Sequence, residues 1–246
     1  MTKKVALITG CSSGIGLAVA ELLSKTEDWV VVGCARSVET KKINETLYHY
    51  KCDLRDSKRI QSMFDYILAD FGRIDLAILN AGIVSHTNLL DSDVEDWRAL
   101  LDVNVLAVSH CTQLAVKAMR DNPKVEDGQV IVVNSMSGHA VHPHPFARFY
   151  STTKHAVTGL VQAWRDEVAD MKPAKNIRMC SISPRMVATN FIYSLFPGNK
   201  AKAEELVRNV PSLTSEDVAE QIMNMIRIPA NVQIQDIHMS PSKKPF

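Results

Sequence analysis

A glycine-rich turn between a short apolar run and a longer segment of helical periodicity constrains the fold of this chain more than any other feature. Val5 to Ile8 are apolar, glycines follow at positions 10, 14 and 16, and apolar residues then recur with helical spacing to position 23. This pattern predicts a strand, a turn and a helix in that order. Such glycines let the backbone approach a pyrophosphate, and the helix N-terminus offers it unpaired N–H groups. The alternative is a turn that uses glycine only for its geometry.

The rest of the chain alternates short apolar runs with longer helical patterns. Further strands are expected at about 29–34, 48–52, 75–79, 129–133, 177–182 and 232–238, and further helices at 58–70, 93–120 and 150–171. The connection over residues 37–47 has room only for a reduced helix. This alternation predicts an α/β fold, a doubly wound parallel sheet of about seven strands with helices on both faces. Ligands then bind at the carboxyl ends of the strands.

Composition fits one soluble domain. The chain has 246 residues, of which 46% are hydrophobic and 22% charged, enough to bury a substantial core. We expect a single dinucleotide-binding and catalytic domain over residues 1–246, with a substrate lid at about 185–212. The formal net charge of +1 gives no electrostatic reason to expect nucleic acid or an anionic membrane as a partner. We see no apolar run near the roughly 18 residues of a membrane span and no signal-peptide core, and we expect a cytoplasmic protein.

The cysteines and histidines predict neither disulfides nor a metal. The five cysteines are odd in number and have no close pairing, so we expect reduced core residues. The two histidines of His142-Pro143-His144 could bind a metal ion. The prolines, and the lack of nearby carboxylates or cysteines as further ligands, favour a loop instead.

Tyr150 and Lys154 form a candidate acid–base pair. They lie four residues apart at the start of a predicted helix and therefore on one face of it. A tyrosine with a pKa of about 10 is about 4 kcal/mol short of ionising at neutral pH. A nearby ammonium can supply roughly that amount, so we expect Lys154 to lower the tyrosine pKa. An amphipathic helix with a solvated lysine is the alternative.

The Gly-x-x-x-Gly-x-Gly spacing together with Tyr150 and Lys154 resembles the short-chain dehydrogenase/reductase family. Three further segments match its motifs in order: Asn80-Ala81-Gly82, Asn104, and Asn134-Ser135-Met136-Ser137-Gly138. Leu79 departs from the pattern, because the family usually has an asparagine there. Within the family, the segments 134–139, 155–158 and 229–237 resemble the animal dehydrogenase/reductase family member 11 group. That group implies a Rossmann-type fold and NADP(H)-dependent chemistry on carbonyls and alcohols, including steroid-like and isoprenoid compounds.

The resemblance also implies roles for individual residues. Tyr150 would transfer the proton, Lys154 would bind the nicotinamide ribose, Ser135 would hold the substrate oxygen, and Asn104 would fix a helix distortion and a water. Ser137 competes with Ser135 for the serine role. The expected cofactor contacts are Gly10, Ser12, Ser13, Gly14, Ile15, Gly16, Arg36, Asp53, Leu54, Asn80, Ala81, Gly82, Tyr150, Lys154, Pro184, Val187 and Thr189.

Cofactor choice is expected to depend on the end of the second strand, where Ala35 precedes Arg36. A guanidinium there favours the 2′-phosphate of NADP, whereas a carboxylate would favour NAD. A solvated loop arginine is the alternative, and Ser12-Ser13 lacks the basic residue that many NADP-using relatives carry in the glycine loop.

The substrate side departs from the family at Pro184-Arg185, where a glycine usually follows the proline. Arg185 either points to solvent or reaches an acidic group. The apolar stretch 191–196 either lines a substrate lid or packs as an ordinary helix. We expect an NADP(H)-dependent oxidoreductase for a lipophilic carbonyl and its alcohol, assembled as a homodimer or homotetramer. An NAD-linked alcohol dehydrogenase and a non-catalytic NADP-binding regulator remain alternatives.

Overall fold

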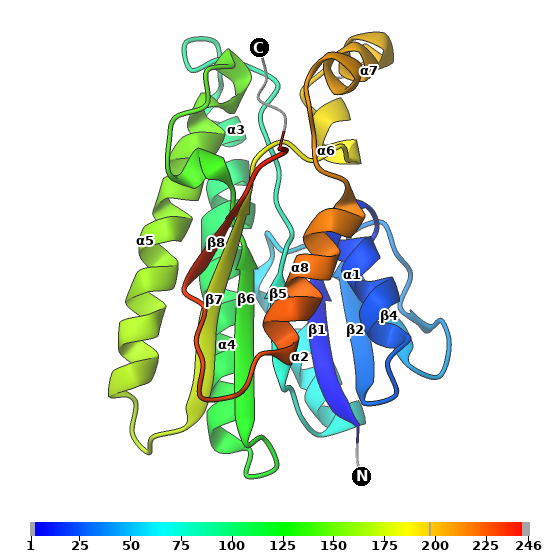
Figure 1. The fold of residues 1–246 in the computed structure, drawn as a ribbon, viewed down its shortest axis with the longest axis vertical. Helices are drawn as coiled ribbons and strands as arrows, with labels where there is room; N and C mark the ends of the chain where they lie inside the picture. Colours follow the sequence, from blue (N-terminus) through cyan, green and yellow to red (C-terminus); the bar gives the residue numbers. More distant parts are fainter. Residues whose placement is uncertain (1–2, 197, 243–246) are drawn as a thin grey trace.

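One mostly parallel sheet forms the centre of the computed structural model, which describes residues 3–196 and 198–242 (Figure 1). Within these ranges the sheet has eight strands in the order β3-β4-β2-β1-β5-β6-β7-β8. Their bounds are β1 Lys4–Thr9, β2 Trp29–Ala35, β3 Lys41–Lys42, β4 Leu47–Lys51, β5 Leu76–Leu79, β6 Asp127–Val133, β7 Asn176–Pro184 and β8 Asp236–Met239. The predicted doubly wound sheet is confirmed.

The strand order reverses between β1 and β5. The chain runs from β1 outward through β2 to β4, then returns to place β5 on the other side of β1. Thr9, the last residue of β1, pairs with Cys34 of β2 and with Leu79 of β5. The connections therefore leave in opposite directions above these carboxyl ends, which opens the crevice where such sheets bind ligands.

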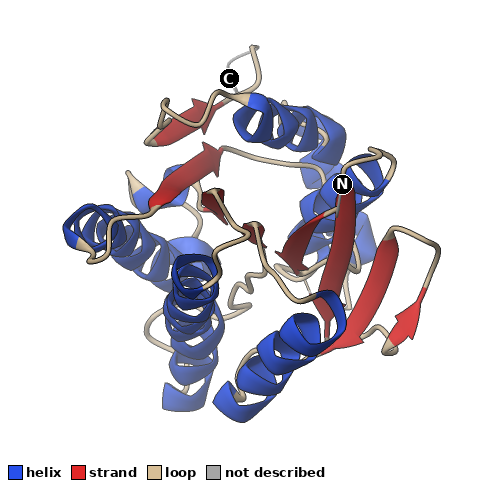
Figure 2. Cartoon of the chain, turned by 90° about the horizontal axis from the view of Figure 1, so that it is seen from below, coloured by secondary structure: helices blue, strands red, loops and turns tan. Residues whose placement is uncertain are grey.

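Helices cover both faces of the sheet (Figure 2). On one face lie α1 Gly14–Ser24 and α8 Ser215–Arg227, and on the other lie α2 Ser57–Phe71, α4 Ala107–Asp121 and α5 Arg148–Asp170. The alternating side chains of β1 show the division, because Leu7 packs with the second group and Ile8 with the first. A strand buried on both faces needs such a continuous apolar run.

The helix α2 shows how an apolar pattern in the sequence corresponds to a buried helix face. Ile60, Met63, Phe64 and Ile67 follow helical spacing, and all four are buried. Asp56 caps the first turn, since its side chain accepts hydrogen bonds from the backbone N–H groups of residues 58 and 59. Local signals and tertiary burial agree here.

The segment 37–47 does not form the reduced helix that we expected. It forms β3, which pairs antiparallel with β4 and raises the strand count to eight. The side-chain oxygen of Asn44 accepts hydrogen bonds from the backbone N–H groups of Thr46 and Leu47 at 2.9 and 2.8 Å. This local turn lets the short connection fold back on the sheet edge instead of completing a helix.

The last strand begins later than predicted. β8 starts at Asp236, although the apolar pattern suggested a start at residue 232. The side chain of Gln233 accepts the hydrogen bond of Met179 N at 3.1 Å, so a side chain takes the position that a strand backbone would occupy. Pairing with β7 then begins at Asp236.

The predicted helix at 93–120 forms, and one π-helical turn lies within it. It comprises α3 Val94–Leu101, a π-helical turn at Asp102–Leu106 and α4. In the described ranges it is also the one helix long and apolar enough to span a membrane, with a mean hydropathy of 1.4 over an 18-residue window. Polar residues interrupt this helix, so it is not the continuous apolar run of a membrane span that was expected to be missing. Half of that window is buried inside the fold, as expected for a core helix.

All five cysteines are free and buried, in agreement with the prediction of reduced core residues. The segment 142–144 lies in the loop before a short 3-10 turn, Pro145–Ala147.

Candidate active site

The glycine loop is tied to the end of β5 by side-chain hydrogen bonds. The hydroxyl of Thr9 accepts from the backbone N–H groups of Asn80 and Ala81 at 3.0 and 3.1 Å. The amide of Asn80 donates to the carbonyl oxygens of Thr9 and Gly10 at 3.0 and 3.2 Å. The structure therefore brings the predicted loop and the segment 80–82 together, and it adds Thr9, which the sequence interpretation missed.

Glycine is needed at two positions of the loop for different reasons. Gly14 has a φ of 59°, and a Cβ there would lie 3.2 Å from Cγ2 of Thr189. A Cβ on Gly16 would lie 2.4 Å from the carbonyl oxygen of Gly10. Glycine is thus required by backbone conformation at the first position and by close packing at the second. Thr189, a predicted contact, lies directly against the loop.

The N-terminus of α1 fits an anionic ligand. Its N-cap residue Ser13 makes no side-chain capping hydrogen bond, and the first turn of α1, which the structure describes in full, contains no acidic residue. The first N–H groups of a helix have no partner within the helix and carry a partial positive charge. These groups suit a pyrophosphate, and the binding of one at this turn stays a prediction.

A cluster of charged residues follows the ends of β2 and β4. Asp53 follows β4, and Arg55 contacts it in a forked ion pair, with Nη2 at 2.6 Å and Nε at 3.1 Å from its carboxylate oxygens. This guanidinium lowers the pKa of Asp53, and Arg36, exposed after β2, lowers it further. Leu54 is buried in the core cluster. The sequence interpretation missed Arg55, although its position two residues after Asp53 was a usable signal.

The catalytic candidates meet at the carboxyl ends of β6 and β7. Tyr150 and Lys154 lie on one face of α5, as predicted, and are 9% and 4% exposed. Nζ of Lys154 donates to the carbonyl oxygen of Val133 at 2.9 Å and lies 5.7 Å from the centre of the Tyr150 ring. The side chain of Ser135 lies close enough to Tyr150 to lower the pKa of the tyrosine. Of the two serine candidates, Ser135 is therefore the one placed at the tyrosine, and its hydroxyl also accepts from Ser137 N at 3.1 Å.

Burial sets the protonation of this pair. It raises the pKa of Tyr150 to about 12, although the nearby Ser135 lowers that pKa in part. It lowers the pKa of Lys154 to about 8. The expected lowering of the tyrosine pKa by Lys154 is not seen, because the loss of water penalises the charged form of each group and dominates both shifts. At neutral pH the tyrosine is protonated.

Asn104 lies inside the π-helical turn, at the position where a helix distortion was predicted. Its Oδ1 accepts from Ile83 N at 2.9 Å, and its Nδ2 donates to Ile83 O and to Oγ1 of Thr153 at 2.9 and 3.0 Å. The hydroxyl of Thr153 in turn donates to the carbonyl oxygen of Tyr150 at 2.7 Å. Thr153 thus links Asn104 to the backbone of Tyr150. The sequence interpretation missed Thr153, although its position between Tyr150 and Lys154 was a signal.

The substrate side begins where β7 ends at Pro184. The backbone N–H of Arg185 donates to Met239 O, and the residue is exposed, so its side chain lies at the surface. Val187 forms an isolated bridge with Leu213, and Thr189 caps α6, Asn190–Tyr193. The predicted lid over 185–212 also contains α7, Lys200–Asn209. Its function as a lid stays a prediction, and residue 197 lies outside the described ranges.

The apolar stretch 191–196 is divided between two environments. Phe191 and Leu195 pack in the cluster of Tyr150, and the Phe191 ring centre lies 5.4 Å from that of Tyr150. Ile192 and Phe196 instead pack with Ala203 of α7. Packing against α7 therefore accounts for part of the stretch, and a substrate-lining role for the part beside Tyr150 stays a prediction.

Comparisons with known proteins agree with this geometry. Residues 4–200 match the family model described as short chain dehydrogenase. "Dehydrogenase/reductase SDR family member 11" of Gallus gallus is 40% identical, over 99% of this chain and 98% of that protein. "Farnesol dehydrogenase" of Aedes aegypti is 33% identical over 99% and 98% of the two chains. A solved structure of serine dehydrogenase complexed with NADP+ has a TM-score of 0.84 and 25% identity, and the match covers 96% of this chain and 94% of that one.

Proposed function

This chain belongs to the short-chain dehydrogenase family, and from that premise we propose that it uses NADP(H) to interconvert a lipophilic carbonyl compound and its alcohol. The observation that carries the proposal is the buried pair Tyr150 and Lys154 with the half-buried Ser135 next to it, at the same edge of the sheet as the glycine loop. A protein that only bound a dinucleotide would need the loop, but it would have no use for a protonated tyrosine held against a serine hydroxyl.

The residues of the crevice fit a nicotinamide dinucleotide. The glycine loop and the uncapped first turn of α1 would hold the pyrophosphate, and Lys154 would reach the nicotinamide ribose. When bound, the cofactor supplies or accepts the hydride. Arg36 favours NADP(H), because a guanidinium pairs with a 2′-phosphate through charge-assisted hydrogen bonds. Arg55 already neutralises Asp53, which removes a carboxylate that would repel that phosphate.

Tyr150 would donate its proton to the substrate oxygen during reduction and recover it from the alcohol in the reverse direction. The burial that raises its pKa keeps it protonated at neutral pH. Ser135 would hold and polarise the same oxygen. A charged Lys154 would stabilise the tyrosinate that remains after proton transfer. Asn104 and Thr153 would fix the first turn of α5, so that the hydroxyl stays aimed at the substrate.

The surroundings of Tyr150 favour an apolar substrate. Val84, Leu100, Phe191 and Leu195 pack in its cluster. Apolar surface buried against such a lining contributes about 25 cal/mol per Å², whereas an unpaired hydroxyl is penalised. The relative named farnesol dehydrogenase is consistent with an isoprenoid or another lipophilic alcohol as the substrate here.

The test is a series of alkyl methyl ketones of increasing chain length, assayed with NADPH and in parallel with NADH. We expect kcat/KM to rise with each added carbon until the pocket is filled, and to be higher with NADPH. A simple sugar serves as the polar control and should be a poor substrate. A flat or falling trend from the smallest ketone would refute the apolar site, and equal rates with NADH would refute the cofactor assignment.

A further inference from the structure

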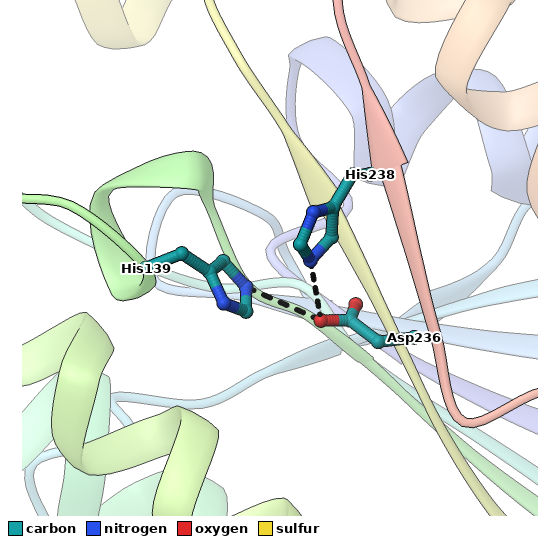
Figure 3. Close-up of side chains that lie close together, drawn as sticks. All are labelled: His139, Asp236 and His238. Carbon is teal, nitrogen blue, oxygen red and sulfur yellow. Dashed lines mark hydrogen bonds and ion pairs between the residues drawn. The ribbon is translucent and has the colours of Figure 1, made fainter.

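Two histidines and a carboxylate converge beside the segment that carries Ser135. His139 directly follows the 3-10 turn Met136–Gly138, whereas Asp236 and His238 belong to β8 (Figure 3). Nε2 of His139 lies 3.2 Å from Oδ2 of Asp236, and Nε2 of His238 lies 3.0 Å from the same oxygen. The three ligand-type atoms all lie within 4.8 Å of one another.

These separations match a small tetrahedral metal site. Zinc binds histidine nitrogen and carboxylate oxygen at about 2.0–2.2 Å, so neighbouring ligand atoms around it are about 3.3 Å apart. The two nitrogen-to-oxygen separations are already close to this value. A small rotation of the exposed His238 ring would complete the triangle, because its side chain is 50% exposed and lies in the edge strand.

A buried hydroxyl orients the carboxylate. Ser183 of β7 is fully buried, and its Oγ donates to Oδ1 of Asp236 at 3.1 Å. The second carboxylate oxygen faces both imidazoles and lies 3.4 Å from the same hydroxyl, which also contacts Nε2 of His139 at 3.0 Å. Such a partner behind a ligand is typical of metal sites, because it fixes the direction of the ligand's lone pairs. Among the described residues, no lysine or arginine forms an ion pair with Asp236, so its charge remains available to a cation.

We propose that His139, Asp236 and His238 bind one divalent transition-metal ion, for which Zn²⁺ is the best match. Two imidazoles and one carboxylate are ligands that zinc accepts, and water would complete four-coordination. The ion would join β8 to the turn that positions Ser135. This site is separate from the proposed oxidoreductase chemistry, which needs no metal, and the two proposals stand or fall independently.

The experiment is a Zn²⁺ titration of the full chain, purified without a histidine tag and stripped with a chelator, followed by calorimetry and by competition with a chromophoric chelator. We expect one equivalent to bind and to raise the midpoint of thermal unfolding. His238→Gln should weaken binding at least about tenfold, and Ser183→Ala, which removes only the orienting hydroxyl, by a smaller factor. His86→Gln, which changes an exposed histidine outside the cluster, is the matched control and should bind like the wild type.

Three results would overturn the proposal. The first is no binding by the wild type at equimolar Zn²⁺, which would leave a hydrogen-bonded His-Asp-His cluster. The second is equal affinity of wild type and His238→Gln, and the third is an equal loss in His86→Gln. If a variant fails to fold, anomalous scattering from wild-type crystals grown with Zn²⁺ decides the question, because the peak must lie between Asp236 and the two rings.

Discussion

The glycine-loop end and the lid end of the crevice are held in place by different kinds of interaction. At the glycine loop, Thr9 and Asn80 make four hydrogen bonds that join the ends of β1 and β5. At the lid, the backbone of Leu213 bonds to Met186 and Ala188, and beyond that bridge Ile192 and Phe196 pack against α7. One end is fixed by directional polar contacts and the other mainly by apolar packing.

This difference implies that the two ends should respond differently to substitution. A hydrogen-bond network requires particular residue types at particular positions, and an unpaired buried group in it is costly. Apolar packing tolerates exchange among residues of similar volume. Residues of the predicted lid should therefore tolerate exchange without disturbing the loop, and the proposed catalytic residues lie between the two regions.

The largest effect is expected at that boundary. Tyr150→Phe removes the hydroxyl that transfers the proton, so kcat should fall by about 10²–10⁴-fold. NADPH affinity, measured by fluorescence titration, should change little. Tyr193→Phe, which removes a hydroxyl within the lid, is the matched control and should retain most activity. Turnover of Tyr150→Phe within about tenfold of wild type would rule out the acid–base role.

The burial of Lys154 should make stability depend on pH. Its pKa is about 8 in the fold, below its ordinary value of 10.5 in an unfolded chain. Between these values the unfolded state binds the lysine proton more tightly, so Lys154 by itself makes the free energy of unfolding rise with pH, by at most about 1.4 kcal/mol per unit. The buried cysteines, whose pKa values are raised, act in the opposite direction, so the test is the difference between two proteins. Urea denaturation of cofactor-free wild type and Lys154→Met from pH 8 to 10 measures it. The slope against pH should be less positive in Lys154→Met, and identical slopes would contradict the burial argument.

At the glycine-loop end, Thr9→Val tests the polar network. The change preserves shape but leaves the N–H groups of Asn80 and Ala81 without their acceptor. Each such loss costs about 1–3 kcal/mol, so the free energy of unfolding should fall by at least that much, and NADPH binding should weaken. Thr152→Val, at an exposed position of α5, should have little effect on stability. Equal stability of both variants would show that the loop is not held by this network.

Arg36→Asp should shift cofactor preference. A carboxylate repels the 2′-phosphate of NADPH and can accept the ribose hydroxyls of NADH. We expect the NADPH-to-NADH ratio of kcat/KM to fall by about 10–100-fold, the value of one charge-assisted contact. Arg227→Asp, an equal charge reversal on α8, should leave the ratio unchanged. If the ratio stays at the wild-type value in Arg36→Asp, another residue selects the cofactor.

The smallest effect on kcat/KM is expected from two substitutions that distinguish the two parts of the apolar stretch 191–196. Phe191→Ala should lower kcat/KM for the longest ketones by about three- to tenfold and flatten the chain-length trend, because it removes apolar surface beside Tyr150. Phe196→Ala opens a cavity against α7 and should lower stability while keeping the trend. The same change of slope in both variants would show that the stretch acts as one surface.

Much of the fold was predictable because its signals are local. The alternating apolar runs predicted the parallel sheet, and the spacing of Ile60 to Ile67 predicted α2, since periodicity directly reports which face is buried. The family motifs predicted which side chains would gather at the strand ends. They do gather there, while the individual roles of Asn104, Ser135 and Lys154 stay predictions. The hairpin at 37–47 was missed because the Asn44 turn was not recognised, and the start of β8 because a Gln233 side chain replaces backbone pairing.

The sequence by itself determined the fold class, the family and the chemical types of the site residues, because these follow from periodicity and from motifs a few residues long. Only the tertiary structure decided how those groups behave. The pKa of Tyr150 rises because distant elements exclude water from it, and no local pattern encodes that exclusion. The division of residues 191–196 depends on where α7 packs, and the meeting of His139 with Asp236 and His238 depends on the pairing of β7 with β8. Contacts between segments far apart in the chain are set by packing, which a linear pattern does not record.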